Sequence, residues 1–348
     1  MSTFSQQLAR LRDNTLDYLP LGAGRNIIVT VLVAYVVIVV LLGMYWSIAP
    51  GYLETRKHTD ELLQEINGKA VTGTETTAAL IGVMEVLLDK RGGFLHNDRF
   101  PPGVYLDNMP NWEFGALVQS RDLARAMRES FSRSQSQSTE DPDLSEAEPN
   151  FHFNANSWIL PATESEYRDG LAYLHSYFRR LSDERAPDAQ FYARADNLRT
   201  WLATVETRLG SLSQRLSASV GQERFNTDLA GDAEATQSTA TPAEMLVKTP
   251  WMEIDDVFFE ARGTSWALIQ FLRAIEIDFE DVLKKKNAQV SVAQIIRELE
   301  ATQDMVWSPM ILNGSGFGLL ANHSLVMASY ISRANAAIID LRELLAQG

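Results

Sequence analysis

The chain has 348 residues, with 45 Asp and Glu against 31 Lys and Arg, and it contains no cysteine. Its formal charge of −14 argues against nucleic acid and anionic lipid headgroups as partners of a soluble domain, because like charges repel. The absence of cysteine excludes disulfides, thiolate metal sites and cysteine nucleophiles. The length suffices for one large domain or two modest ones.

An uncharged apolar segment lies near the N-terminus, at residues 27–48 (IIVTVLVAYVVIVVLLGMYWSI). A bilayer core of about 30 Å requires about 20 helical residues, so this segment is long enough to span a membrane. It exceeds the roughly 7–15 apolar residues of a cleaved signal core, and Pro50 follows directly after the small residues where cleavage would occur. The sequence therefore predicts an uncleaved transmembrane signal anchor, with the lipid bilayer as its partner.

The basic residues on either side of this segment indicate which end of the predicted membrane span faces the cytoplasm. Three precede it and three follow it: Arg10, Arg12 and Arg25, then Arg56, Lys57 and Lys69. Arg25 lies closest, and Lys and Arg near a membrane span favour the cytoplasmic side. We therefore expect residues 1–26 to be a short cytoplasmic tail. Residues 49–348 are then expected to form a periplasmic domain outside a bacterial inner membrane.

The body of the chain shows helical periodicity. Apolar residues recur at alternating spacings of four and three over residues 188–220, and again over 163–181 and 254–286. Shorter segments of the same kind cover 74–90, 291–309 and 318–345. We find no sustained strand-like alternation. The predicted fold is therefore all-α, with one N-terminal transmembrane helix followed by a large multi-helix bundle with long antiparallel hairpins, of which 163–181 with 188–220 is one.

Two stretches depart from this periodicity. Residues 132–149 are polar and acidic, and residues 221–250 are rich in Ala, Thr, Asp and Gly. Both are predicted to be mobile loops. They are consistent with insertions in one bundle or with a boundary between two domains, and the sequence leaves both possibilities open.

The run from Asp89 to Gly115 (DKRGGFLHNDRFPPGVYLDNMPNWEFG) concentrates turn-forming, polar and aromatic residues. Glycine after Arg91 suits the end of a helix, and Asn111 is a natural N-cap for a helix that begins at Trp112. Aromatic side chains are expected to pack this loop against the bundle and are the candidate binding residues: Phe94, Phe100, Tyr105 and Trp112.

The same run offers candidate catalytic groups, namely His96, Asp98 and Glu113. A hydrolase that uses paired carboxyls needs one protonated acid and one carboxylate at a set separation. No recognised catalytic or metal-binding spacing is present here, so hydrogen bonding within the loop is the favoured interpretation. We assign no catalytic residue, metal site or cofactor. No nucleophile elbow, Walker motif or dinucleotide fingerprint occurs elsewhere.

Three long segments carry a resemblance to a known family. They are the 89–115 run, residues 133–167 (RSQSQSTEDPDLSEAEPNFHFNANSWILPATESEY) and residues 313–341 (NGSGFGLLANHSLVMASYISRANAAIIDL). Together with the N-terminal anchor they resemble the family called domain of unknown function 2333, from Gram-negative proteobacteria. The resemblance covers nearly the whole chain and implies a single-pass inner-membrane protein. It implies no activity and supplies no catalytic residue.

From these observations we expect a non-catalytic, membrane-anchored helical scaffold or interaction protein of the bacterial cell envelope. Its partner would be another envelope protein or a second copy of the chain. The alternative is a periplasmic hydrolase that acts on a cell-envelope polymer through carboxylates of the 94–113 loop.

Overall fold

The computed structural model describes residues 23–134, 139–183, 188–225, 242, 244–308, 310–313, 319 and 321–347. The predicted cytoplasmic tail therefore lies largely outside the described residues, as do residues 314–318. Within the described part the chain is almost entirely helical, which confirms the predicted all-α class. The one sheet there is an antiparallel hairpin of β1 (Gln222–Phe225) and β2 (Glu244–Val247), with Gln222 opposite Val247.

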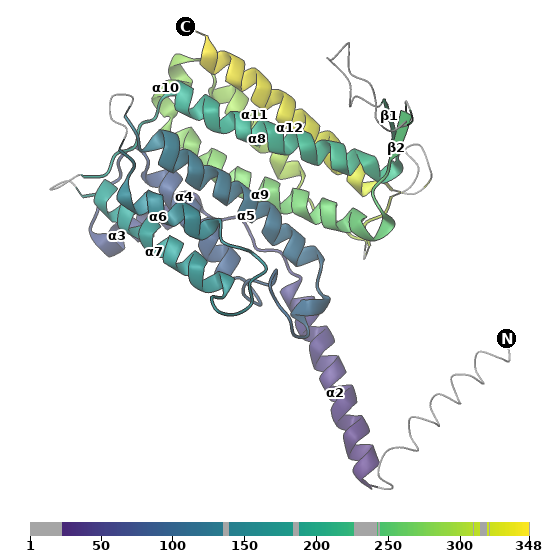
Figure 1. Cartoon of the computed structure of the whole chain (residues 1–348). Helices are drawn as coiled ribbons and strands as arrows, with labels where there is room; N and C mark the ends of the chain where they lie inside the picture. The colour runs from purple at the N-terminus through teal and green to yellow at the C-terminus, as the bar shows by residue number, and fades with distance from the viewer. Residues whose placement is uncertain are drawn as a thin grey trace.

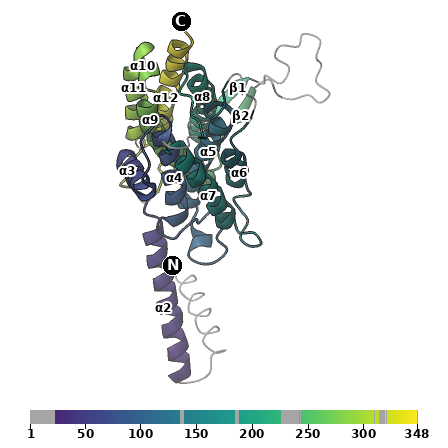
Figure 2. The same ribbon diagram turned by 90° about the vertical axis from the view of Figure 1, so that its left-hand side faces the viewer.

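The first described helix, α2 (Ala23–Trp46), projects from one end of a helical bundle (Figures 1 and 2). Residues 26–46 are long and apolar enough to cross a membrane. Their large side chains face outward, and Val31 and Leu32 are 62% and 61% exposed. The outward-facing side chains are apolar on all sides, which is unfavourable in water and favourable in lipid.

The bundle is built in three tiers (Figure 1). The central tier is formed by α5 (Asn108–Ala126) and α9 (Ile254–Asp278). One outer tier contains α3 (Thr55–Ile66), α4 (Thr74–Asp89), α6 (Pro142–Phe151) and α7 (Thr163–Leu181). The other contains α8 (Ala195–Ser217), α11 (Gln289–Ala301) and α12 (His323–Ala346), with the short α10 (Glu280–Lys285) at one end. Buried apolar side chains from Leu62 to Leu345 form one connected core.

The central helices α5 and α9 run parallel and approach closely through glycine. A Cβ on Gly115 would lie 2.1 Å from the carbonyl oxygen of Glu260, and one on Gly263 would lie 1.8 Å from that of Trp112. Neither position therefore accepts a side chain without moving a backbone. The rings of Trp112 and Trp266 pack beside this contact, with centroids 5.0 Å apart.

The apolar spacing correctly predicts which face of α8 is buried: Leu198, Leu202, Val205, Leu209, Leu212 and Leu216 all lie in the core. The predicted hairpin partner is wrong, because α8 packs antiparallel against α12 while α7 packs against α4 and α6. Residues 188–194 are not helical, and the amide of Tyr192 donates to the carbonyl of Phe131 (2.6 Å). This extended segment carries the chain from one outer tier to the other.

The prediction of a mobile loop over 132–149 is also wrong in its second half, where α6 forms. Asp141 caps the helix by accepting from the amides of Asp143 (3.0 Å) and Leu144 (3.3 Å), and Pro142 occupies the first turn. Leu144, Ala147 and Phe151 form its buried face. Residues 135–138 lie outside the described part, as do 226–241 and 243 of the predicted 221–250 loop.

Helices α4 and α7 begin at residues 74 and 163, as the sequence predicts, and hydrogen bonds to other segments hold these starts in place. The hydroxyl of Thr163, the first residue of α7, donates to the carbonyls of Asn154 (2.8 Å) and Ser157 (2.9 Å) in the loop before the helix. Helix α4 follows Gly73, which has no capping side chain. The carboxylate of Asp278, at the end of α9, accepts from the amides of Gly73 and Thr76 (both 2.7 Å) and so caps α4 from outside.

We expect Gly263→Ala to lower the free energy of unfolding by at least about 1–3 kcal/mol, because the added methyl meets backbone that cannot yield. Urea unfolding of the full chain in mild detergent, followed by circular dichroism, measures the change. Gly210→Ala in α8 is the matched control, since its Cβ would lie 3.6 Å from its nearest neighbour, Asn335. That variant should gain about 0.5–1 kcal/mol from helix propensity. Equal stability of the two variants would contradict the packing argument.

Candidate functional site

The loop predicted as the candidate site, between α4 and α5, lies at the end of the bundle from which α2 leaves (Figure 1). It contacts the last turns of α2 directly. Gly92 has a φ of +86°, and a Cβ there would lie 2.7 Å from the ring of Trp46. The guanidinium of Arg91 sits 5.1 Å from the ring centroid of Tyr45. The end of the apolar helix is therefore part of the folded domain.

A buried carboxylate holds this loop in place. Glu113, on the first turns of α5, accepts from the amide of Leu95 (2.9 and 3.1 Å to its two oxygens) and from that of His96 (2.8 Å). It also forms an ion pair with Lys90, whose side chain is almost fully buried and donates to the carbonyl of Gly93. Burial raises the pKa of Glu113 to about 7, while Lys90 and the two amides oppose the shift.

The other two candidate catalytic residues do not converge on Glu113. The Nδ1 atom of His96 lies 3.1 Å from the carbonyl oxygen of Pro110, and its ring stacks on Phe114. Burial lowers the pKa of His96, which favours the neutral imidazole. The pKa of Asp98 is raised, first by burial and then by the nearby carboxylate of Glu164. The side chains of Glu113 and His96 thus serve hydrogen bonding within the loop.

The four candidate binding aromatics separate into two pairs. Phe94 and Trp112 are buried in the core, and Phe94 packs edge-on against Tyr167 (5.6 Å between centroids). Phe100 and Tyr105 are 65% and 75% exposed. Helix α5 begins at Asn108 with Asp107 as its cap, one turn before the predicted start at Trp112. This earlier start places Trp112 in the α5–α9 contact, so Trp112 cannot meet a partner.

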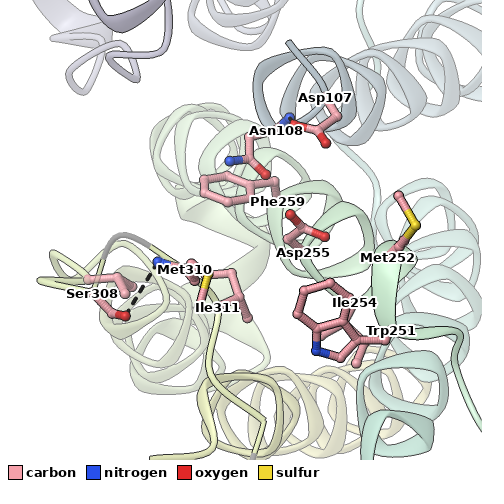
Figure 3. Close-up of a pocket in the computed structure, with 11 residues that line it drawn as sticks. Asp107, Asn108, Trp251, Met252, Ile254, Asp255, Phe259, Ser308, Met310 and Ile311 are labelled. Carbon is pink, nitrogen blue, oxygen red and sulfur yellow. Dashed lines mark hydrogen bonds between the residues drawn. The ribbon is translucent and has the colours of Figure 1, made fainter. Parts of the chain in front are cut away.

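A cavity lies on the neighbouring surface rather than among the predicted site residues. It is found where α5 and α9 begin and where the chain leaves α11. This cavity of about 270 Å³ has Asp107, Asn108 and Asp255 on its polar side (Figure 3). Its apolar walls carry Trp251, Met252, Ile254, Phe259, Val306, Met310 and Ile311. We call this cavity the α9 groove. A second hollow of about 420 Å³ shares Asn108, Phe259 and Val306 with it and reaches the linker at 47–52.

The side chains around the α9 groove are more exposed than apolar residues usually are. Trp251, Met305 and Trp307 are 77%, 70% and 89% exposed. Acidic groups lie next to these apolar side chains. Burial, together with the charges of Asp255 and Asp107, raises the pKa of Asp256 to about 6. Sequence periodicity missed this groove because much of its wall, at 251–252, 306, 308 and 310–311, lies outside the α-helices. The available signal was the pair of tryptophans beside Pro250 and near Pro309.

Within the described part of the chain, no group of three or more His, Asp or Glu side chains is arranged to hold a metal ion. At the acidic start of α9, Asp256 accepts a hydrogen bond from the side-chain Nδ2 of Asn111 (2.7 Å), and this bond joins α9 to α5. The lining of the α9 groove itself offers apolar contact and the negative charge of Asp107 and Asp255.

We expect Lys90→Met to destabilise the protein by about 3–5 kcal/mol, because it leaves the Glu113 carboxylate buried without its cation. The loss should be larger at pH 8 than at pH 5. A carboxyl whose folded pKa is raised, here from 4.5 to about 7, adds stability that is fully present below the unfolded pKa and is lost as the pH rises through the folded one. Removing Lys90 raises the folded pKa further.

Urea unfolding at the two pH values measures this difference. Lys57→Met, which removes an exposed lysine 3.9 Å from Glu61, is the matched control and should change stability little at either pH. A Lys90→Met loss of equal size at pH 5 and pH 8 would show that Glu113 does not carry the effect.

Comparison with known proteins identifies the chain at the family level. Residues 22–348 match a family described as an uncharacterized protein conserved in bacteria, DUF2333, and the match begins next to the first residue of α2. No curated protein and no solved structure matches the chain. The resemblance expected from the sequence is thereby confirmed: the chain belongs to the DUF2333 family of bacterial proteins.

Proposed function

We propose that this protein is a single-pass, non-catalytic membrane protein of the bacterial cell envelope whose helical bundle binds a partner protein. In this proposal residues 1–26 lie in the cytoplasm, residues 27–48 span the inner membrane and the bundle from 49 to 348 lies in the periplasm. The observation that carries it is the exposed apolar surface of α2, joined without a break to a folded domain.

The packing of α2 supports an anchor over a removable signal sequence. Gly43 is buried, and a Cβ there would lie 3.6 Å from that of Pro102 and 3.7 Å from the side chain of Leu106. Trp46 covers the backbone at Gly92. Cleavage after Ala49 would strip these contacts from the domain. The family match also includes the helix, so α2 belongs to the same unit as the bundle.

The α9 groove supports the role in interaction. Tryptophan and methionine are enriched at protein interfaces, and flexible methionine side chains adapt to a partner's shape. Because Asp107 and Asp255 border the apolar wall, the fitting partner is an apolar segment that carries Lys or Arg. The adjoining hollow reaches the linker after α2, so a partner anchored in the same membrane could reach the groove.

The geometry gives the alternative, an envelope hydrolase, no comparable support. A carboxyl that protonates or attacks a substrate must reach it, whereas Glu113 is fully buried and bonded to two amides and a lysine. His96 likewise uses its Nδ1 within the loop. We therefore propose structural roles for these groups.

The anchor is tested by removing its apolar character. Val33→Arg together with Val36→Arg should release the chain from membranes, because an arginine at the centre of a span costs about 2.5–3.5 kcal/mol. Alkaline extraction and sedimentation measure the membrane-bound fraction, and Val290→Arg, on the exposed start of α11, is the control. The intact mass of the wild-type chain should include residues 1–49, and a reporter that requires export should be active only at the C-terminus. A mature chain that begins near residue 50 would contradict the proposal.

The groove is tested by photo-crosslinking in intact membranes. A photoreactive residue in place of Trp251 should form a discrete adduct with an integral or envelope protein, because this side chain lines the groove and is 77% exposed. Asp255→Lys should abolish that adduct by reversing the local charge, whereas Asp169→Lys on the exposed face of α7 should not. An adduct that persists in Asp255→Lys, or none at all, would contradict binding at the groove.

A further inference from the structure

Two loops beside the end of α2 expose an unusual concentration of large apolar side chains. One loop precedes α5 and the other precedes α7, and both lie at the end of the bundle from which α2 leaves (Figures 1 and 2). The exposed residues, from 44% for Trp158 to 90% for Leu160, are Phe100, Val104, Tyr105, Trp158, Ile159 and Leu160. The core lies elsewhere, so these side chains have no packing role in the bundle.

The two loops form one surface. The rings of Phe100 and Trp158 pack edge to face with centroids 5.5 Å apart. Beneath them the buried side chain of Asn97 donates to the carbonyl of Ser157 (2.9 Å) and to the carboxylate of Glu164 (2.9 Å). We call this surface the apolar tip. Because its base is fixed by buried hydrogen bonds, the apolar side chains project from a held position.

The position of the apolar tip along α2 is set by contacts with that helix. Trp46 meets Gly92, whereas Gly43 meets Pro102 and Leu106, which flank Val104 and Tyr105. Gly43 precedes Trp46 by three residues, or about 4.5 Å along a helix axis. The loop therefore extends past Trp46 toward the apolar part of α2, to the depth at which Trp and Tyr favour a membrane interface.

In the loop before α5, backbone amides of the apolar tip are already hydrogen-bonded within the protein. The amides of Val104, Tyr105 and Leu106 donate to the carbonyls of Phe100 (3.1 Å), Pro102 (2.9 Å) and Gly103 (2.9 Å). In the other loop the hydroxyl of Ser157 donates to the carbonyl of Pro161 (2.7 Å). Prolines at 101, 102 and 161 lack a donor. Entry into lipid is costly chiefly when backbone groups are left unpaired, and this surface limits that cost.

We infer that the apolar tip inserts into the interface of the bilayer that α2 spans, as a second membrane contact that fixes the orientation of the bundle. The inference rests on the proposed function, in which α2 is a membrane anchor. Two contacts at different points on the bundle prevent it from turning about α2. The α9 groove is thereby held at one height and one direction relative to the lipid surface.

The absence of cysteine makes the test direct, because one introduced cysteine is the only site for a thiol-reactive probe. Val104→Cys and Leu160→Cys, each labelled with an environment-sensitive fluorophore, are reconstituted as the full chain in phosphatidylethanolamine and phosphatidylglycerol vesicles. Nitroxide-labelled lipids then quench any probe that reaches the bilayer. Both probes should be quenched several-fold more than one at Val290→Cys, which is 81% exposed at the start of α11. Shallow nitroxides should quench them more than deep ones.

A probe at Val36→Cys in α2 separates the two proposals, since it should be quenched best by deep nitroxides. If Val36 is quenched while Val104 and Leu160 behave like Val290, the apolar tip does not enter lipid and the inference is overturned, although the anchor stands. Blue-shifted emission at Val104 and Leu160 without lipid quenching would mean that protein covers the tip, which also overturns it. An unquenched Val36 would instead overturn the anchor. Circular dichroism of each labelled chain confirms that the substitutions, all at exposed positions, leave the fold intact.

Discussion

The close contact between α5 and α9 is the constraint on which the other features depend. Gly115 and Gly263 bring the two backbones together, so α5 can neither rotate nor slide without a collision. This fixed rotation turns Glu113 toward the loop after α4 and leaves Asn108 facing the α9 groove. The same contact thus positions the loop beside α2 and one wall of the groove. Helices α5 and α9 are parallel and are separated by many residues of intervening chain, so no short turn holds them together. A specific contact such as this one is needed to fix their relative position.

The buried pair of Glu113 and Lys90 illustrates how a polar group can specify a loop. Desolvating two charges costs free energy that their attraction offsets only when the remaining hydrogen bonds are made. Here two loop amides and the carbonyl of Gly93 complete them. Any displacement of the loop would leave a carboxylate unpaired in the core, so one loop conformation is strongly preferred. That preference matters because the loop is the surface on which the end of α2 packs.

Sequence reasoning succeeded where one local pattern determines the outcome and failed where a distant segment does. The length and apolar character of α2 and the buried face of α8 follow from composition and spacing alone. The partner of α8 does not, because an apolar face specifies burial but not against which helix. The cap of α4 by Asp278 joins residues some 200 positions apart, which no local signal reports. Trp112 and Trp307 are the same residue type, yet Trp112 is buried in the core and Trp307 is 89% exposed.

The location of the α9 groove has a consequence for recognition. Its neighbouring hollow is bounded by the linker after α2, so the groove lies close to the end of the bundle from which α2 leaves. With α2 as the proposed membrane anchor, a partner confined to the same bilayer would encounter the groove at a higher effective concentration than a freely diffusing protein would. Modest affinity is then sufficient, which suits a shallow surface of mobile methionines and exposed tryptophans better than a deep, rigid pocket would. Acidic groups at the rim add discrimination, because an apolar segment without a basic residue would leave Asp107 and Asp255 partly desolvated and unpaired.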